Sequence, residues 1–204
     1  MNILKNIDMI NKKIWFISDS HFAHRNVLEF ENRPFETIEE MESEMIEAWN
    51  SVVGKNDLVY MLGDFCFGGV AKWIEILDQL KGQITLIKGN HDKSKIIERV
   101  KRDGYLEEIH YVGEYIKIDN MQLHLTHYPL GMGERPFLMN ISGHIHSKPS
   151  ELINQVNVGV DSAFMENYQK EKGLPFGTPV DLEYIMEHLR KINEIISAKY
   201  VKGS

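Results

Sequence analysis

The sequence has little cysteine, no long hydrophobic run and no excess of basic residues. Cys66 is the only cysteine among 204 residues, which excludes a disulfide within the chain and favours a reducing compartment. The apolar runs are short, such as residues 58–62, far below the roughly 20 residues needed to cross a bilayer. The first 13 residues lack the apolar core of a secretory signal. We therefore expect a cytoplasmic protein without a membrane anchor.

The charge balance is acidic, with 23 Lys and Arg against 30 Asp and Glu, a formal net charge of −7. This disfavours extended contact with nucleic acid, which requires many cationic side chains, but it is compatible with a short basic groove or a bound cation. The hydrophobic fraction of 43% and charged fraction of 26% are those of an ordinary globular protein. We expect a single domain over residues 1–204, because this length fits one core better than two.

Strand-like and helical patterns alternate in the first half of the chain. Strands are expected at 14–17, 58–62 and 84–87, with helices at 38–52, 70–80 and 94–102. Thr37 and Glu40 form a capping box before the first of these helices.

The second half contains closely spaced apolar runs. Strands are expected at 109–112, 115–118 and 121–126, and the polar pairs between them, at 113–114 and 119–120, predict antiparallel hairpins. Further strands are expected at 137–141 and 155–160, and a final helix at 181–197. The pattern as a whole predicts an α/β or α+β domain with a β-α-β-α-β first half and an antiparallel second half.

Side chains that can bind metal follow five of the apolar runs. They are Asp19, His21, Asp64, Asn90, His127, His144 and His146. In open α/β sheets ligands bind beyond the carboxyl ends of the strands, so these side chains are expected to meet at one place. Mixed oxygen and nitrogen donors suit Mn²⁺, Fe or Zn²⁺, and the lack of clustered thiolates argues against a structural zinc site.

Seven ligands are too many for one metal ion. If Asp64 is shared, they divide into two sets of four, and a carboxylate can bridge cations about 3.5–4 Å apart. Gly63, Gly89 and Gly143 precede ligands, where a tight turn or a close backbone approach would exclude a β-carbon.

These segments read D-x-H, G-D, G-N-H-D, H and G-H-x-H in chain order, and with them the sequence from about Ile14 to Asp161 resembles the calcineurin-like metallophosphoesterase superfamily. Residues 16–24 and 32–35 resemble its small bacterial and phage single-domain branch. The resemblance implies a four-layer sandwich of two mixed β-sheets flanked by helices, with two divalent metal ions at one end. Manganese is favoured, with iron, zinc or nickel as alternatives.

The resemblance also implies a role for each ligand. The first metal would be held by Asp19, His21, Asp64 and His146, and the second by Asp64, Asn90, His127 and His144.

By the same resemblance, His91 faces the substrate phosphate and the leaving group. An imidazole suits the donation of a proton to a departing alkoxide, and Asp92 would orient it as a catalytic partner. The alternative for Asp92 is a cap on the helix that begins near Ser94. The expected reaction is in-line attack on phosphorus by a hydroxide that bridges the two metals.

Four further residues are candidates for substrate binding. His24 and Arg25 follow the first ligands and would reach a substrate phosphate, although His24 is favoured as a support for the neighbouring ligand. Arg33 and Arg135, each followed by proline, are candidate phosphate clamps. Residues 63–69 lack the substrate-binding arginine of phosphoprotein phosphatases, which disfavours that activity.

The sequence thus predicts a metal-dependent phosphoesterase acting on a small, nucleotide-like phosphodiester or phosphomonoester. A nuclease is the alternative, disfavoured by the charge of −7 and the lack of a basic run. A metal-binding scaffold without activity is disfavoured because no ligand of the motif is missing.

Overall fold

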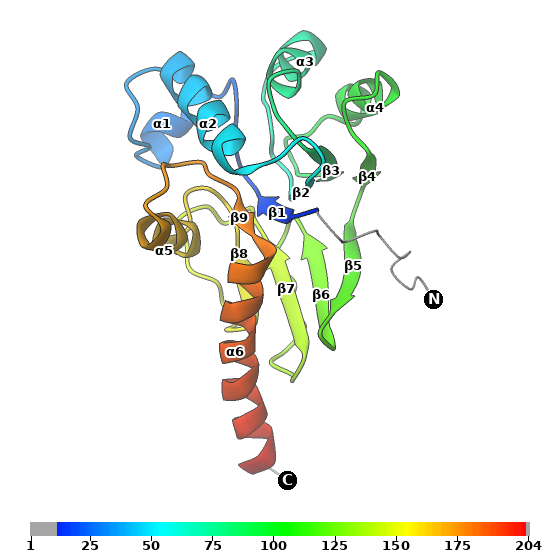
Figure 1. The fold of residues 1–204 in the computed structure, drawn as a ribbon, viewed down its shortest axis with the longest axis vertical. Helices are drawn as coiled ribbons and strands as arrows, with labels where there is room; N and C mark the ends of the chain where they lie inside the picture. The colour runs from blue at the N-terminus through cyan, green and yellow to red at the C-terminus, as the bar shows by residue number, and fades with distance from the viewer. Residues whose placement is uncertain (1–11, 203–204) are drawn as a thin grey trace.

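A computed structural model describes residues 12–202, so Met1–Asn11 and Gly203–Ser204, including most of the segment searched for a secretory signal, lie outside the described residues. Within residues 12–202 the chain forms two β-sheets and six helices (Figure 1). The first sheet has the strand order β4-β3-β2-β1-β9. Its strands are β1 (Ile14–Ile17), β2 (Leu58–Met61), β3 (Gln83–Ile87), β4 (Glu108–His110) and β9 (Val180–Asp181).

The second sheet has the order β5-β6-β7-β8. Its strands are β5 (Gly113–Ile118), β6 (Met121–Thr126), β7 (Leu138–Ser142) and β8 (Gln155–Asn157). Both sheets are mixed, because β9 is antiparallel to β1, and β5 to β6, whereas the other pairs are parallel.

Four helices belong to the first sheet: α1 (Val27–Phe30), α2 (Ile38–Val52), α3 (Val70–Leu77) and α4 (Ser94–Arg102). Figure 1 shows them grouped on one side of that sheet, where Trp49 and Trp73 are buried against apolar residues of β1–β3. The predicted cap of α2 is confirmed, since the Thr37 hydroxyl accepts a hydrogen bond from the Glu40 N–H at 3.1 Å. The helix predicted at 70–80 ends at Leu77, because hydrogen-bonded turns replace it as far as Leu80.

The helices α5 (Ala163–Lys172) and α6 (Leu182–Lys202) share a second hydrophobic core with the facing sides of both sheets. Phe16 of β1, Leu123 of β6 and Leu189 of α6 are fully buried in it. This core confirms the expected sandwich of two mixed sheets flanked by helices. The helix α5 was not predicted, and its signals are the Ser162 cap and the left-handed Gly173 that ends it.

The prediction of an antiparallel second half was wrong. Strand β4 pairs in parallel with β3, and the chain then crosses to the other sheet, so Gly113 begins β5 instead of forming a hairpin turn. Gly113 allows close approach to β6, since a β-carbon there would overlap the Leu125 carbonyl. Only Asp119 and Asn120, both with positive φ, form a hairpin turn. A two-residue polar gap is compatible with both a turn and a change of sheet, and its length alone does not separate them.

No helix among residues 12–202 is long and apolar enough to span a membrane.

The strands β1, β2, β3, β6 and β7 end at the same edge of the sandwich, where the loops that follow them are hydrogen-bonded to one another. The Asp19 N–H donates to the Gly63 carbonyl at 3.0 Å, and the Gly143 N–H donates to the His127 carbonyl at 3.0 Å. The sandwich therefore brings together five loops that are far apart in the sequence.

Asp57 links the beginnings of β1 and β2, and its replacement tests this end of the fold. Its buried carboxylate accepts hydrogen bonds from the Trp15 indole at 2.9 Å and from the N–H groups of Gly54 and Lys13 at 2.8 and 3.1 Å. We expect Asp57→Ala to lower the free energy of unfolding by about 1–3 kcal/mol, because these donors lose their acceptor. Urea denaturation measures the change. The exposed control Glu47→Ala should shift it by less than about 0.5 kcal/mol, and an equal effect of both substitutions would contradict the assignment.

Candidate metal centre

The first group of donors at this edge comes from the loops after β1 and β7. Asp19 Oδ1 lies 4.0 Å from His21 Nε2 and 3.9 Å from His146 Nε2. Asp19 and His21 are almost completely buried, and His146 is partly exposed. These three side chains have the spacing of a metal-binding group.

The second group comes from the loops after β2, β3, β6 and β7. Asp64 Oδ2 lies 3.4 Å from His127 Nε2, and His144 completes a metal-binding group with these two residues. Asn90 Oδ1 lies 2.9 Å from His127 Nε2. All seven ligands predicted from the sequence therefore lie in one of two adjoining clusters.

Asp64 lies between the two groups. Its Oδ2 atom is 3.9 Å from His21 Nε2 in the first group and 3.4 Å from His127 Nε2 in the second. Its other oxygen accepts a hydrogen bond from the His91 backbone N–H at 2.8 Å. This is the position that the prediction of a shared carboxylate requires.

Hydrogen bonds fix which ring nitrogen of two histidines faces the cluster. His127 Nδ1 lies 2.8 Å from the Leu62 carbonyl, which can only accept, so Nδ1 carries a proton and Nε2 is the nitrogen directed at the cluster. His146 Nδ1 lies 3.0 Å from Asp161 Oδ2, which leaves its Nε2 directed toward Asp19 in the same way. Both imidazole rings are therefore held in an orientation in which Nε2 can bind a metal ion.

The donor set fits divalent cations. Among the described residues, Asp19 Oδ1 and His21 Nε2 are buried without a hydrogen-bond partner, although both point into the first group. Burial raises the pKa of Asp19 to about 6 and lowers the pKa of His21 to about 3. The neutral imidazole is the form that binds a metal, and a nearby cation would favour the ionised form of the aspartate. A metal ion would thus satisfy both orphaned atoms.

The backbone at the site is strained. Asp19, His21, Asp64, His144 and His146 have φ between 50° and 70°, in the left-handed region that residues other than glycine rarely adopt. Such residues cost about 1 kcal/mol or more each and concentrate at functional sites. They turn each loop sharply enough to direct its side chain into the cluster.

Glycines make room for the ligands at two of these turns. A β-carbon on Gly89 would overlap the Asp64 carboxylate, and one on Gly143 would overlap the carboxylate of Asp19. The close approach predicted for these glycines is confirmed. Neither has a positive φ, so the space beside the carboxylate is what requires glycine.

The prediction that Asp92 pairs with His91 or caps a helix was wrong on both counts. Its buried carboxylate accepts hydrogen bonds from the N–H groups of Asp64, Phe65 and Gly89 at 2.9, 3.1 and 2.8 Å. The residue at the cap position of α4 is Lys93. Asp92 therefore holds the loops after β2 and β3 together and fixes the backbone of Asp64.

The prediction that Arg33 clamps a substrate phosphate was also wrong. Its guanidinium is buried and forms a two-pronged ion pair with Asp161 at 2.8 Å for both contacts. The remaining donors bind the carbonyls of Asp19 and Ser20, each at 2.8 Å. Asp161 in turn accepts from His146, so the pair joins the loop of the first ligand to that of the last.

The sequence analysis missed this role of Asp161. The signal was the one used for the ligands, since Asp161 is a carboxylate directly after the apolar run at 155–160.

Comparisons with known proteins agree with this geometry. The family model described as calcineurin-like phosphoesterase matches residues 12–171, which include every predicted ligand. The chain belongs to the calcineurin-like phosphoesterase family.

Two relatives show the extent of the sequence similarity. The chain is 35% identical over 159 residues to the uncharacterized protein MJ1445 of Methanocaldococcus jannaschii, a match that covers 75% of this chain and 90% of that protein. It is 40% identical over 81 residues to the gene 66 protein of Mycobacterium phage L5, covering 38% of this chain and 39% of the phage protein.

A solved structure has a similar fold. The crystal structure of the protein of unknown function AQ665 from Aquifex aeolicus superposes with a TM-score of 0.65 and 25% identity. The superposition covers 87% of this chain and 99% of that one.

The other residues predicted to bind substrate differ in their positions relative to the two groups of metal-binding donors. His24 Nδ1 lies 3.3 Å from His21 Nδ1, and Arg25 beside it is exposed. Arg135, in contrast, precedes β7, whereas the ligands follow the other end of that strand. The prediction that Arg135 clamps a phosphate was therefore wrong, because β7 separates it from the centre.

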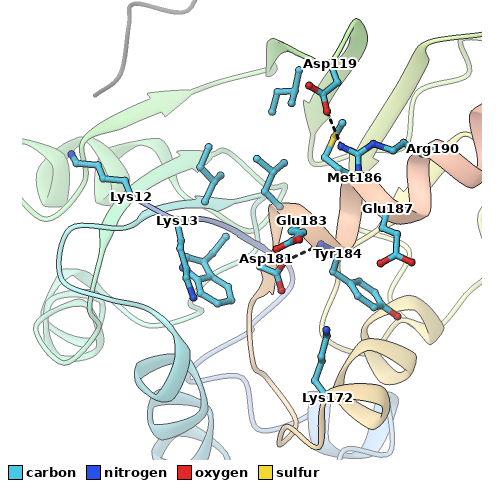
Figure 2. A pocket seen from close by; sticks show the side chains of 14 residues that line it. Lys12, Lys13, Asp119, Lys172, Asp181, Glu183, Tyr184, Met186, Glu187 and Arg190 are labelled. Carbon is cyan, nitrogen blue, oxygen red and sulfur yellow. Dashed lines mark hydrogen bonds and ion pairs between the residues drawn. The ribbon is translucent and has the colours of Figure 1, made fainter. Parts of the chain in front are cut away.

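A separate hollow lies where β1 begins, away from the ligands that follow its other end (Figure 2). Its lining contains both acidic and basic side chains, among them Lys13, Asp181 and Glu183. Asp119 and Arg190 form an ion pair across part of it at 2.7 Å. This hollow shares no residue with the two groups of metal-binding donors.

We expect Asp64→Asn to reduce the manganese bound per chain to one ion or fewer, because the amide lacks the charge to hold two cations. Elemental analysis after loading with Mn²⁺ and gel filtration measures the stoichiometry. The exposed Asp119→Asn variant is the control and should keep the wild-type value. Retention of two ions by Asp64→Asn would contradict a shared role.

We expect Asp161→Ala to weaken Mn²⁺ binding by about 10- to 100-fold, the range seen when a partner of a metal-bound histidine is removed. Calorimetric titration with Mn²⁺ gives the affinity, and thermal denaturation shows whether the variant folds. Removing the surface ion pair of Glu134 and Lys199 by Glu134→Ala is the matched control. A folded Asp161→Ala protein with unchanged affinity would refute the role of the buried pair.

Proposed function

We propose that this protein is a metal-dependent phosphoesterase that hydrolyses a small phosphodiester or phosphomonoester of the nucleotide type. The observation that carries the proposal is the position of Asp64, whose Oδ2 lies within 4.0 Å of ring nitrogens of His21, His91 and His127. Two adjoining groups of donors with a shared carboxylate suit the two-metal hydrolysis of phosphate esters.

Oxygen and nitrogen donors without thiolates support two divalent ions in these groups, with Mn²⁺ favoured over iron, zinc or nickel. Asp19, His21, Asp64 and His146 would hold the first ion, and Asp64, Asn90, His127 and His144 the second. When bound, the ions lower the pKa of water and neutralise charge on the phosphoryl oxygens.

The position of His91 supports a role in the reaction. Its backbone N–H is fixed to Asp64, while its side chain is 47% exposed and its Nε2 lies 4.0 Å from Asp64 Oδ2. The ring is thus held at the solvent side of the cluster, where a substrate would enter. We infer that Nε2 donates a proton to the departing oxygen, and that Asp92 assists only by fixing the loop.

The first test is hydrolysis of bis(p-nitrophenyl) phosphate and p-nitrophenyl phosphate by the manganese-loaded protein. Turnover that disappears in the Asp64→Asn variant is the expected result. The absence of metal-dependent turnover on both compounds and on a panel of natural phosphoesters would overturn the proposal in favour of a metal-binding scaffold.

The second test concerns His91. We expect His91→Gln to lower kcat about 100-fold or more on alkyl phosphodiesters, because an alkoxide leaves poorly without a proton. The loss on nitrophenyl esters should be smaller, since nitrophenolate leaves without protonation. Steady-state kinetics on both ester types, with metal content measured in parallel, gives the comparison. An equal loss on both types would exclude proton donation to the leaving group.

A further inference from the structure

Three of the predicted histidine ligands are arranged in the same way. In each, Nε2 faces an aspartate of the cluster, and Nδ1 has a hydrogen-bond partner. The partner is a backbone carbonyl for His127 and the Asp161 carboxylate for His146. For His21 it is the imidazole of His24, whose Nδ1 lies 3.3 Å from His21 Nδ1. A second histidine thus occupies the position that a carbonyl or a carboxylate occupies elsewhere in the centre.

The direction of this hydrogen bond follows from metal binding by His21. Its Nε2 is buried without a hydrogen-bond partner among residues 12–202, and it lies 4.0 Å from Asp19 Oδ1 and 3.9 Å from Asp64 Oδ2. A neutral imidazole binds a metal through the nitrogen that carries no proton, so the proton of His21 is on Nδ1 when Nε2 binds the ion. His24 Nδ1 is then the acceptor, and the proton of its own neutral ring is on Nε2.

Packing holds the ring of His24 in place beside His21. It stacks face to face on Phe67, with centroids 3.8 Å apart and an angle of 7° between the planes. The Phe67 N–H donates to the Phe22 carbonyl at 2.8 Å, which ties Phe67 to the loop of His21. The His24 N–H donates to the His21 carbonyl at 3.1 Å and closes a tight turn between the two histidines. Both the backbone and the ring of His24 are therefore fixed relative to His21.

The turn between the two histidines is anchored to two helices. The Ala23 N–H donates to Glu42 Oε1 of α2 at 2.8 Å, and Glu42 Oε2 pairs with Lys72 of α3 at 2.7 Å. Glu42 is buried, and Ala23 has a φ of 59°, in the left-handed region. This conformation is costly for alanine, so the anchor holds the turn in a shape that the local sequence does not favour.

The neighbouring Arg25 cannot take the place of His24. Its side chain is exposed, and a guanidinium donates hydrogen bonds but accepts none. Its positive charge would also repel a metal ion. A role of Arg25 in substrate binding stays a prediction, whereas the contact of His24 is with a ligand.

We propose that His24 is a positioning residue for the metal ligand His21: its Nδ1 accepts the Nδ1 proton of His21 and thereby directs His21 Nε2 at the first metal ion. This inference rests on the proposed function, because it takes His21 as a ligand. Hydrogen-bond partners of metal-bound histidines fix the orientation of the ring, and their loss weakens metal binding by about 10- to 100-fold. In this role His24 acts through the ligand and not on the substrate.

Two substitutions separate the hydrogen bond from the stack. His24→Phe keeps a ring that can stack on Phe67 but lacks an acceptor, whereas His24→Asn keeps an acceptor near the position of Nδ1. In calorimetric titration with Mn²⁺, we expect one of the two ions to bind about 10- to 100-fold more weakly to His24→Phe. His24→Asn should bind both ions within about threefold of the wild-type affinity, because its side-chain oxygen replaces one neutral acceptor with another.

His124→Phe is the matched control. His124 is also partly buried, but its ring contacts Tyr115 and it belongs to neither group of donors. This variant should keep the wild-type affinity for Mn²⁺. Thermal denaturation shows whether each variant is folded.

Nitrogen-15 NMR of the zinc-loaded protein tests the direction of the hydrogen bond. Zn²⁺ is diamagnetic, and spectra of the labelled histidines show which ring nitrogen carries the proton. We expect the proton of His21 on Nδ1 and that of His24 on Nε2. The signals of His24 are assigned by their absence from His24→Asn, a variant in which His21 should keep its proton on Nδ1.

Unchanged affinity in a folded His24→Phe protein, an equal loss in both variants, or a proton on His24 Nδ1 would overturn the role of His24. Any of these results would leave the proposed function intact if the wild type still hydrolyses phosphoesters. Conversely, Mn²⁺ binding that is lost in His24→Phe and restored in His24→Asn, without any turnover by the wild type, would support the pairing and reject the phosphoesterase.

Discussion

The structure depends on the burial of two aspartates among four imidazoles at one edge of the sandwich. Asp19 and Asp64 are 0% and 2% exposed, and a carboxylate without compensating charges or hydrogen bonds is costly to bury. Asp64 is compensated by the His91 amide and by its histidine neighbours, whereas one oxygen of Asp19 has no partner among the described residues. Cations would remove this cost, so metal binding and the stability of these loops are linked.

Two further buried acids hold the ligand loops. Asp92 gathers three backbone amides of the loops after β2 and β3. Asp161 joins Arg33 to His146, and so connects the loops after β1 and β7. Both hold strained turns that the ligands would not maintain by themselves. The ligand geometry is thus imposed by side chains that do not point into the cluster.

Much of this arrangement could be predicted from the sequence, because the carboxyl ends of parallel strands meet at one edge. That rule placed Asp19, Asp64 and His127 together, and the spacing in 38–52 and 94–102 gave α2 and α4. The errors arose where a residue type allows two partners. Arginine before proline suits a phosphate as well as a buried carboxylate, and only the distant Asp161 decides for Arg33. The same holds for Asp92, because two of its three amide partners, Asp64 and Phe65, come from another loop. It also holds for the polar gap at Gly113, where the sheet that accepts the next strand decides between a turn and a crossing.

The ion pair of Arg33 and Asp161 spans 128 residues and encloses every ligand except the first two. Arg33 therefore gains its carboxylate partner only when the chain extends to Asp161. The pair therefore ties the first ligand loop to the segment that follows β8 in the second sheet. The complete centre therefore requires the chain as far as Asp161, although α5, β9 and α6 still follow that residue.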